Sequence, residues 1–327
     1  MKTLALLLSM ILVSCATTGN RQSHKPISPE QYTQMLQKGI DVNWANFPKF
    51  IKLYDKKVVQ DFKDIGFSHV RIRVRCDTSE KYFSHLDTVI NDCLNTGLIP
   101  IIALAATEFK KNPNEKTMQK EVDWWAKAAN RYKNCSYLLS FDLMIEATDN
   151  IRHRQDMLNR YFEEATAAIR KTNPYRIVFV SSRIRSAPEY LKDIKIPSQA
   201  NGYVAAEFHF YASGPSKTSG GKKWTTGTEA EKEILRKKVA IAKQWSAQTG
   251  IPLWVGAWMP GDYNKGDHYT IEEQVKFANF VVCLLEKNNI PWAVNADGQF
   301  YDMKKKQWRQ DRYPVLQTLI NPHCNKQ

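Results

Sequence analysis

Residues that can donate or accept protons follow two of the β-rich runs in this chain. Glu146 comes just after one run, and Glu207, His209 and Tyr211 alternate along another. Alternate residues of a strand point to the same side, so the last three share one face. Carboxyl, imidazole and phenol groups serve enzymes as general acids and bases. The pattern predicts a catalytic site with Glu146 across from these three residues, although structural roles stay open for each of them.

Arginines gather on the same part of the predicted fold. Arg71 and Arg73 alternate along one run, so their side chains share a face, and Arg183 follows another run. Guanidinium groups match the geometry of carboxylate and sulfate, and their burial needs an anionic partner. We therefore expect these arginines to bind an acidic sugar. The alternative is a set of internal salt bridges with carboxylates on neighbouring runs: Asp41, Asp142 and Glu207.

Aromatic and amide side chains complete the predicted substrate-binding set. Trp44 and Trp258 end β-rich runs, and Trp224 lies in a basic, Gly- and Ser-rich stretch that is expected to form a lid over the cavity. These three rings are expected to stack on sugars. Asn43 and Asn295, near the ends of the first and last runs, are expected to bind the substrate through their amides.

The elements that must position these residues alternate regularly along the chain. Helix-like segments with an apolar face separate short β-rich runs, and no linker interrupts the pattern after residue 38. This order predicts the α/β class and a single (β/α)8 TIM barrel, whose chemistry would lie at the carboxyl ends of the strands. The eight runs are residues 39–44, 69–74, 99–104, 137–143, 176–180, 203–210, 252–256 and 291–294.

Several short motifs, in the right order, resemble family 5 of the glycoside hydrolases, the cellulase-like barrels. The resemblance covers residues 38–320 and implies a TIM barrel that acts on polysaccharides. It also implies that Glu146 is the general acid/base, that Arg71 is the active-site arginine and that His209 and Tyr211 belong to the site. The matching stretches are Gly39–Trp44, Asp61–Ile72, Phe141–Ala147, Phe208–Tyr211 and Pro252–Trp258.

The chain departs from that family's pattern at the residues that matter most. The glutamate nucleophile, which would follow Gly256 on the seventh strand, is replaced by Ala257. The asparagine and proline that usually flank the acid/base are Ile145 and Ala147, and Asn295 replaces a tryptophan on the eighth strand. A methyl group cannot attack a sugar, so the usual retaining mechanism with two carboxylates is not available as written.

Three functions remain open on these residues. Glu146 could protonate the leaving oxygen while water or another group, such as Asp262 or Asp297, replaces the nucleophile. A polysaccharide lyase would need no nucleophile, because His209 or Tyr211 would abstract a proton from a uronate. The third possibility is a glycan-binding pseudoenzyme that has lost its chemistry. Hydrolysis of an acidic polysaccharide is the leading prediction.

Composition narrows the classes of partner. The chain has 47 basic and 33 acidic residues, a formal charge of +14, with 9 Trp, 14 Tyr and 14 Phe. Such a chain suits an anionic or sugar polymer. No phosphate-binding loop, zinc-protease motif or nucleic-acid signature is found, so we expect no cofactor, no metal site and no nucleic-acid partner. The cysteines after the N-terminal segment include no CxxC pair, and one disulfide of unknown pairing is expected among them.

The N-terminus predicts export and lipid anchoring. Leu4–Val13 is a short apolar run, too short to span a bilayer, and it ends before Cys15 in a pattern that resembles the lipobox of bacterial lipoproteins. We expect residues 1–14 to be a signal peptide, 15–37 a tether that begins at lipidated Cys15, and 38–327 the barrel. The protein would then reside in the cell envelope, at the outer membrane or the cell surface.

Replacing the proposed anchor tests this interpretation. Cys15→Ser should move the protein from the membrane fraction to the soluble fraction, because the polar tether has no other strong affinity for lipid. The fractions are compared by immunoblot after a high-salt wash. A variant that stays fully in the membrane fraction would rule out lipid anchoring at Cys15.

Overall fold

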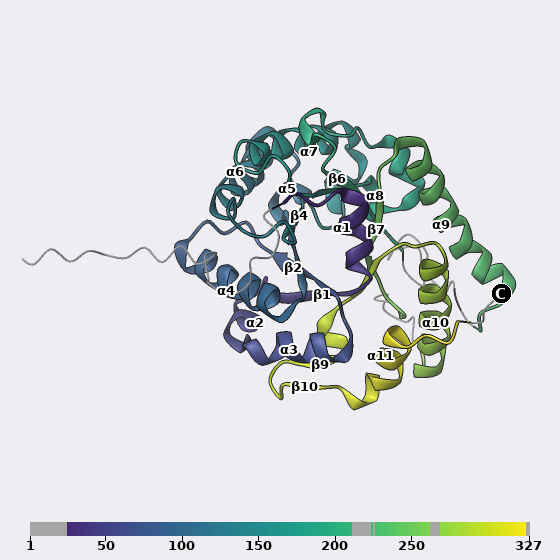
Figure 1. Ribbon diagram of the computed structural model, residues 1–327. Coiled ribbons are helices and arrows are strands. Elements are labelled where there is room, and N and C mark those ends of the chain that lie inside the picture. The colour runs from purple at the N-terminus through teal and green to yellow at the C-terminus, as the bar shows by residue number, and fades with distance from the viewer. Residues whose placement is uncertain (1–24, 211–223, 225, 262–268, 325–327) are drawn as a thin grey trace, which may run out of the picture.

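The computed structural model describes residues 25–210, 224, 226–261 and 269–324. Eight parallel strands pair in sequence order, and β8 pairs back with β1, so the sheet is a closed barrel (Figure 1). The predicted (β/α)8 barrel is confirmed. Its strands are β1 (Lys38–Ala45), β2 (His69–Val74), β3 (Ile99–Leu104), β4 (Ser140–Asp142), β5 (Val178–Ser181), β6 (Val204–His209), β7 (Leu253–Trp258) and β8 (Trp292–Asn295).

Helices surround the barrel and cover its outer face (Figure 1). Several begin at a side chain that caps the first turn, such as Ser79, Thr228 and Thr270, and end at a left-handed glycine such as Gly97 or Gly250. The helices are α2 (Pro48–Leu53), α3 (Lys56–Ile65), α4 (Glu80–Thr96), α5 (Thr107–Lys111), α6 (Glu115–Arg131), α7 (Gln155–Arg170), α8 (Arg183–Ser186), α9 (Glu229–Thr249), α10 (Ile271–Lys287) and α11 (Tyr313–Ile320). A small antiparallel pair, β9 (Tyr301–Asp302) and β10 (Gln307–Trp308), follows β8.

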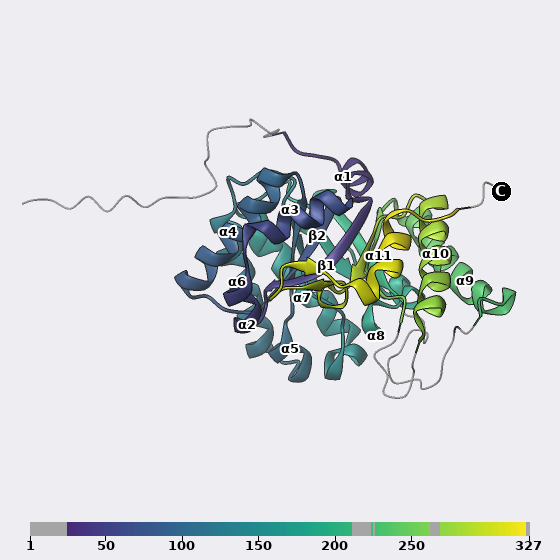
Figure 2. The same cartoon turned by 90° about the horizontal axis from the view of Figure 1, so that it is seen from below.

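One further helix, α1 (Pro29–Leu36), closes the amino-terminal end of the barrel. Figure 2 shows α1 at this end, whereas α5 and α8, which follow strands, lie at the other. Tyr32 and Leu36 are fully buried, and the Tyr32 hydroxyl donates to Ser140 Oγ at 2.7 Å. This segment lies within the predicted tether, residues 15–37. It folds instead because Ser28 and Gln31 form a capping box and because the apolar side chains plug the barrel.

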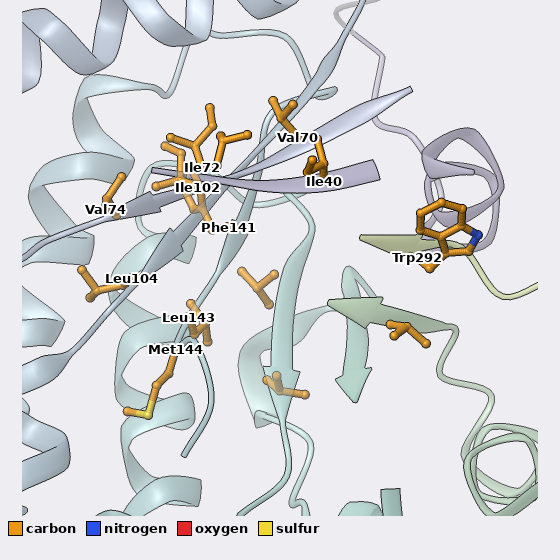
Figure 3. Close-up of a cluster of buried hydrophobic side chains, with 14 of the residues drawn as sticks. Ile40, Val70, Ile72, Val74, Ile102, Leu104, Phe141, Leu143, Met144 and Trp292 are labelled. Atoms are coloured by element: carbon orange, nitrogen blue, oxygen red, sulfur yellow. The ribbon is translucent and has the colours of Figure 1, made fainter. Parts of the chain in front are cut away.

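Two apolar layers hold the barrel. The larger lies between the strands and the helices, where Ile72, Ile102 and Phe141 come together from neighbouring strands (Figure 3). The smaller fills the part of the barrel interior next to α1 and includes Phe179 and Trp254. Cys283 on α10 and Cys324 after α11 form a disulfide, the pair that sequence alone did not name. Among the described residues, no helix is long and apolar enough to cross a membrane.

His69 is buried in the barrel interior next to α1 as a neutral imidazole. Its Nδ1 lies 2.6 Å from the Leu36 carbonyl and its Nε2 3.2 Å from the Trp254 indole nitrogen. Because the indole can only donate, Nε2 accepts and Nδ1 carries the proton. Gly39 makes room for the ring, since a Cβ there would lie 2.2 Å from it. Burial lowers the pKa of His69 to about 4 from its ordinary 6.5.

Stability should therefore depend on pH through His69. In the unfolded chain His69 takes up a proton below its ordinary pKa of 6.5, whereas in the folded protein it stays neutral down to about pH 4. Acidification from pH 6.5 to pH 4 therefore favours the unfolded state and lowers the free energy of unfolding. His69→Asn keeps a donor for Leu36 but cannot ionise. Between about pH 7.5 and about pH 5, the wild type should lose about 2 kcal/mol of unfolding free energy relative to this variant. Denaturant melts at several pH values measure the difference, and exposed His153→Asn is the control. Parallel curves for wild type and His69→Asn would contradict this assignment.

Candidate active site

A pocket of about 350 Å³ opens at the carboxyl ends of the strands. We call it the barrel pocket. Strand ends and the loops after them form its wall, as expected for a TIM barrel. Its lining residues are Asn46, Arg71, Arg73, Ala105, Thr107, Lys110, Ile145, Glu146, Thr148, Ala257 and Asn295. The predicted residues Glu146, Arg71, Arg73 and Asn295 therefore meet at one place.

Glu146 faces this pocket from the segment that follows β4. Its backbone is left-handed, with φ +48°, a conformation that is costly for a residue with a side chain and is found at functional sites. The carboxyl Oε1 lies 3.1 Å from His209 Nδ1, and Oε2 lies 3.9 Å from Arg185 Nη1. Glu146 is 8% exposed, so its carboxyl is largely shielded from water.

Lys110, on the short helix after β3, holds the backbone beside Glu146. Its Nζ donates to the Ile145 carbonyl at 2.6 Å and to the Glu146 carbonyl at 3.2 Å. Burial lowers the pKa of Lys110 to about 8, with the nearby Glu146 charge opposing the shift. Lys110 is a site residue that the sequence did not reveal. Lys110 and Lys111 adjoin in a polar segment, and nothing in the sequence separates the buried lysine from the solvated one.

His209 lies between two carboxylates. Its Nδ1 faces Glu146, and its Nε2 is 3.3 Å from Glu207 Oε2. Burial alone would lower the pKa of His209, but the Glu207 charge and the hydrogen bond with Glu146 outweigh it, so the pKa is raised. The side chain is therefore suited to be an imidazolium that orients Glu146, and it is a poor proton acceptor.

Arg71 is buried at the barrel axis and binds carboxylates from three strands. Its Nε donates to Asp142 Oδ2 at 2.7 Å, and its Nη2 donates to Glu207 Oε2 at 2.9 Å. Asp41 Oδ2 lies 3.6 Å from Nη1. The internal salt-bridge alternative therefore describes Arg71, which cannot bind a substrate anion while these contacts persist. Burial raises the pKa of Asp142 to about 7, although the Arg71 charge opposes the shift.

Arg73 lies two residues farther along β2 than Arg71, nearer to the carboxyl end of the barrel and to solvent. Its Nη2 donates to Asp41 Oδ2 at 2.6 Å and to Asn295 Oδ1 at 2.7 Å. Its side chain is 23% exposed and lines the barrel pocket, in contrast to fully buried Arg71. Of the three predicted anion-binding arginines, Arg73 is the one whose place suits a ligand.

A bulge in β7 aims Ala257 into the barrel pocket. Phe208 pairs with Val255, but the next residue, His209, pairs with Ala257, so the register jumps by one residue. Gly256 and Ala257 both face inward as a result, and Trp258 faces the outer core. Only glycine fits at 256, where a Cβ would lie 2.0 Å from Glu207 Oε2. Bulges next to active sites commonly re-aim a side chain in this way.

The predicted stacking role of three tryptophans is wrong for this structure. Trp44 and Trp258 are fully buried and Trp224 is 1% exposed, so none offers a ring face to a sugar. Each packs in the layer between barrel and helices. Trp44 contacts the ring of Phe62, and Trp224 and Trp258 both contact Phe277. Strand alternation explains the burial of Trp44 and Trp258, because a residue at a strand end can face the helices as readily as the pocket, whereas Trp224 lies outside the strands.

Other predicted residues lie beside the barrel pocket but do not line it. Asn43 donates to Asp297 Oδ1 at 3.2 Å, and burial raises the pKa of Asp297 to about 6. Arg183 pairs with Asp193 at 2.9 Å and stacks on the Tyr190 ring. Tyr211, Asp262 and Cys15, with most of the proposed lid, fall outside the described residues. Among the residues that the structure does describe, no cluster of His, Cys, Asp or Glu could hold a metal ion.

Comparisons with known proteins agree with this geometry. The family model described as cellulase (glycosyl hydrolase family 5) matches residues 30–298. Endoglucanase H of Acetivibrio thermocellus is 26% identical over 93% of this chain and 35% of its own length. A β-xylosidase of Phanerodontia chrysosporium is 22% identical over 54% of this chain and 39% of its own length. The chain thus spans little more than a third of the curated relatives it matches.

Solved structures show the same barrel. The cellulose synthase subunit Z from Clostridioides difficile superposes with a TM-score of 0.75 at 25% identity, covering 88% of this chain and 100% of that one. Endoglucanase Cel5A from Thermotoga maritima gives a TM-score of 0.77 at 24% identity, covering 90% and 100%. The second likeness shows the fold alone. Because the family model spans most of the chain, this protein belongs to glycosyl hydrolase family 5.

Proposed function

We propose that the protein is a glycosidase-like enzyme that cleaves an acidic polysaccharide, with Glu146 as the proton donor to the leaving oxygen. The observation that carries the proposal is the setting of Glu146, whose shielded carboxyl faces the barrel pocket and is held by His209 at 3.1 Å. A general acid needs such a partly desolvated cleft. The names of the two curated relatives, an endoglucanase and a β-xylosidase, support a carbohydrate substrate.

Ala257 takes the place of the nucleophile in this proposal. The bulge in β7 supports the assignment, because it turns this position toward Glu146 although the side chain is only a methyl group. Attack on the sugar must then come from a molecule that enters the pocket. A water that attacks opposite to the leaving group would invert the anomeric configuration.

The acidic character of the substrate is supported by the lining of the pocket. Arg73 and Lys110 both reach it, and Glu146 is its one carboxylate among the described residues. Arg71 and Arg183, by contrast, are engaged within the protein. We propose that the contact to an acidic sugar is made chiefly by Arg73.

Elimination from a uronate is less well supported. It requires a base, and the raised pKa of His209 between Glu146 and Glu207 favours an imidazolium. It also requires a cation to neutralise the uronate carboxylate, a role that is left to Arg73 because Arg71 binds Asp142 and Glu207. Products separate the possibilities: an unsaturated end indicates elimination, and binding without products indicates a pseudoenzyme. The proposed export and lipid anchor would place this activity in the cell envelope.

Glu146→Gln tests the role of the acid. The amide keeps the shape but has no proton to donate, so turnover should fall by about 10²–10⁴-fold. Binding of the same polymer should change little. Turnover is measured as new reducing ends and binding by calorimetry, on a panel of acidic and neutral polysaccharides.

Glu108→Gln is the matched control, because Glu108 is exposed and pairs only with Lys120 on the surface. It should leave turnover unchanged. Wild-type protein that binds a polymer of the panel without cleaving any would refute the enzymatic proposal.

Arg73→Gln tests the charge of the substrate. A charge-assisted hydrogen bond contributes about 1.5–3 kcal/mol, so affinity for an acidic polymer should fall about 10–100-fold, with little change for a neutral one. Raising the salt concentration should weaken the same binding. Arg236→Gln, on the exposed face of α9, controls for the loss of one surface charge. Equal losses on both polymers would show that Arg73 serves only the barrel.

A further inference from the structure

Hydrogen-bond donors line the barrel pocket together with Ala257. Arg73, Lys110 and Asn295 lie around the same pocket as this residue. Asn295 contributes from β8, and because its Oδ1 accepts from Arg73, its amide N–H groups remain as donors. The methyl group of Ala257 offers nothing for these donors to bind.

The charges around the pocket also favour an added anion. Arg71 is already paired with Asp142 and Glu207, so the cations of the lining that remain for a ligand are Arg73 and Lys110, against the one carboxylate of Glu146 among the described lining residues. Behind the lining, Asp41 is shared by both arginines. Lys110 Nζ donates two of its three N–H groups to backbone carbonyls, which leaves one for a ligand.

Among the described residues, few groups near Ala257 could activate a water molecule. His209 lies between two carboxylates that raise its pKa and make it a poor base, and Glu207 is bound by Arg71. Glu146 is needed in its protonated form at the moment of cleavage. An anion that is already a nucleophile avoids this requirement, since it reaches the pocket with its negative charge in place.

We propose that the barrel pocket binds inorganic phosphate against Ala257, through Arg73, Asn295 and Lys110, and that this phosphate is the nucleophile that the methyl group of Ala257 cannot supply. The inference rests on the proposed function, because it uses Glu146 as the acid, and it assigns Arg73 to phosphate in place of an acidic group of the sugar. The protein would then be a phosphorolytic enzyme and not a hydrolase.

The reaction balances without any other reagent. A phosphate oxygen forms a bond to the anomeric carbon as the glycosidic C–O bond breaks, and the electron pair of that bond stays with the leaving oxygen. Glu146 supplies the proton to this oxygen, and the proton of the hydrogen phosphate later restores the Glu146 carboxyl. The products are a glycosyl phosphate and a shortened polymer. Because phosphate attacks opposite to the leaving group, the anomeric configuration inverts.

Phosphate binding is measured first, by calorimetry on the full chain without sugar. Wild type and Ala257→Ser, which keeps the space open, should bind phosphate. Ala257→Glu puts a carboxylate among the donors and should weaken binding by at least about tenfold, through charge repulsion and lost space. Arg236→Gln on α9 should bind as the wild type does. Absence of binding, or equal binding by Ala257→Glu, would overturn the proposal, and circular dichroism checks that this variant is folded.

Cleavage is then followed with and without phosphate on the same polymers, including uronate and neutral ones. Phosphorus NMR detects glycosyl phosphate, and a reducing-end assay detects hydrolysis. Phosphate-dependent glycosyl phosphate, lost in Glu146→Gln, supports the inference. Reducing ends formed equally without phosphate would overturn it and leave the proposed function standing. Phosphate bound with no cleavage of any polymer would overturn both the nucleophilic step and the enzymatic proposal. Phosphate displaced by uronate oligosaccharides but absent from the products would assign the site to a substrate carboxylate and also overturn the step.

Discussion

The buried guanidinium of Arg71 is the contact on which the site depends. It joins carboxylates from β1, β4 and β6 and reaches a backbone carbonyl of β7, so one side chain ties four strands across the barrel axis. Placing a cation there costs desolvation, which its carboxylate partners must offset. Removal of Arg71 would leave Asp142 and Glu207 facing each other in a dry interior. The arginine therefore has a structural role first and a functional one through the groups it holds.

Basic and acidic side chains alternate in a chain of contacts from Arg71 to the pocket. Arg71 holds Glu207, Glu207 faces the imidazole of His209, and His209 contacts Glu146 at the surface of the pocket. The two carboxylates beside His209 raise its pKa, because buried charges are screened little. The same order explains why His209 is a poor base and why Glu146 is firmly placed. Lys110 adds a second restraint by binding the carbonyls at the left-handed turn of Glu146.

The backbone of β7 has a bulge that decides which of its residues enter the pocket. The bulge turns residue 257 into the pocket, and Gly256 beside it has no room for a Cβ next to Glu207. Val255 and Trp258 pack in the outer core instead. The pocket thereby combines an acid, several hydrogen-bond donors and a position that carries only a methyl group. This combination is the reason for proposing that a nucleophile from outside the protein attacks the sugar.

The sequence by itself determined the barrel and the main polar residues of its mouth. Alternation of β-rich runs with amphipathic segments depends on local periodicity, and the predicted strands all lie where the runs are. The convergence of Glu146, His209, Arg71 and Arg73 follows, because parallel strands bring their ends to one edge. The sequence could not settle which strand-end residues face the pocket. Trp44 and Trp258 turn to the helices, and a one-residue bulge turns Ala257 inward, since facing depends on register. Tertiary packing alone also decided that Lys110 is buried, that α1 folds against the barrel and that Cys283 pairs with Cys324. These features join residues far apart in the chain, and no local pattern encodes the distance between them.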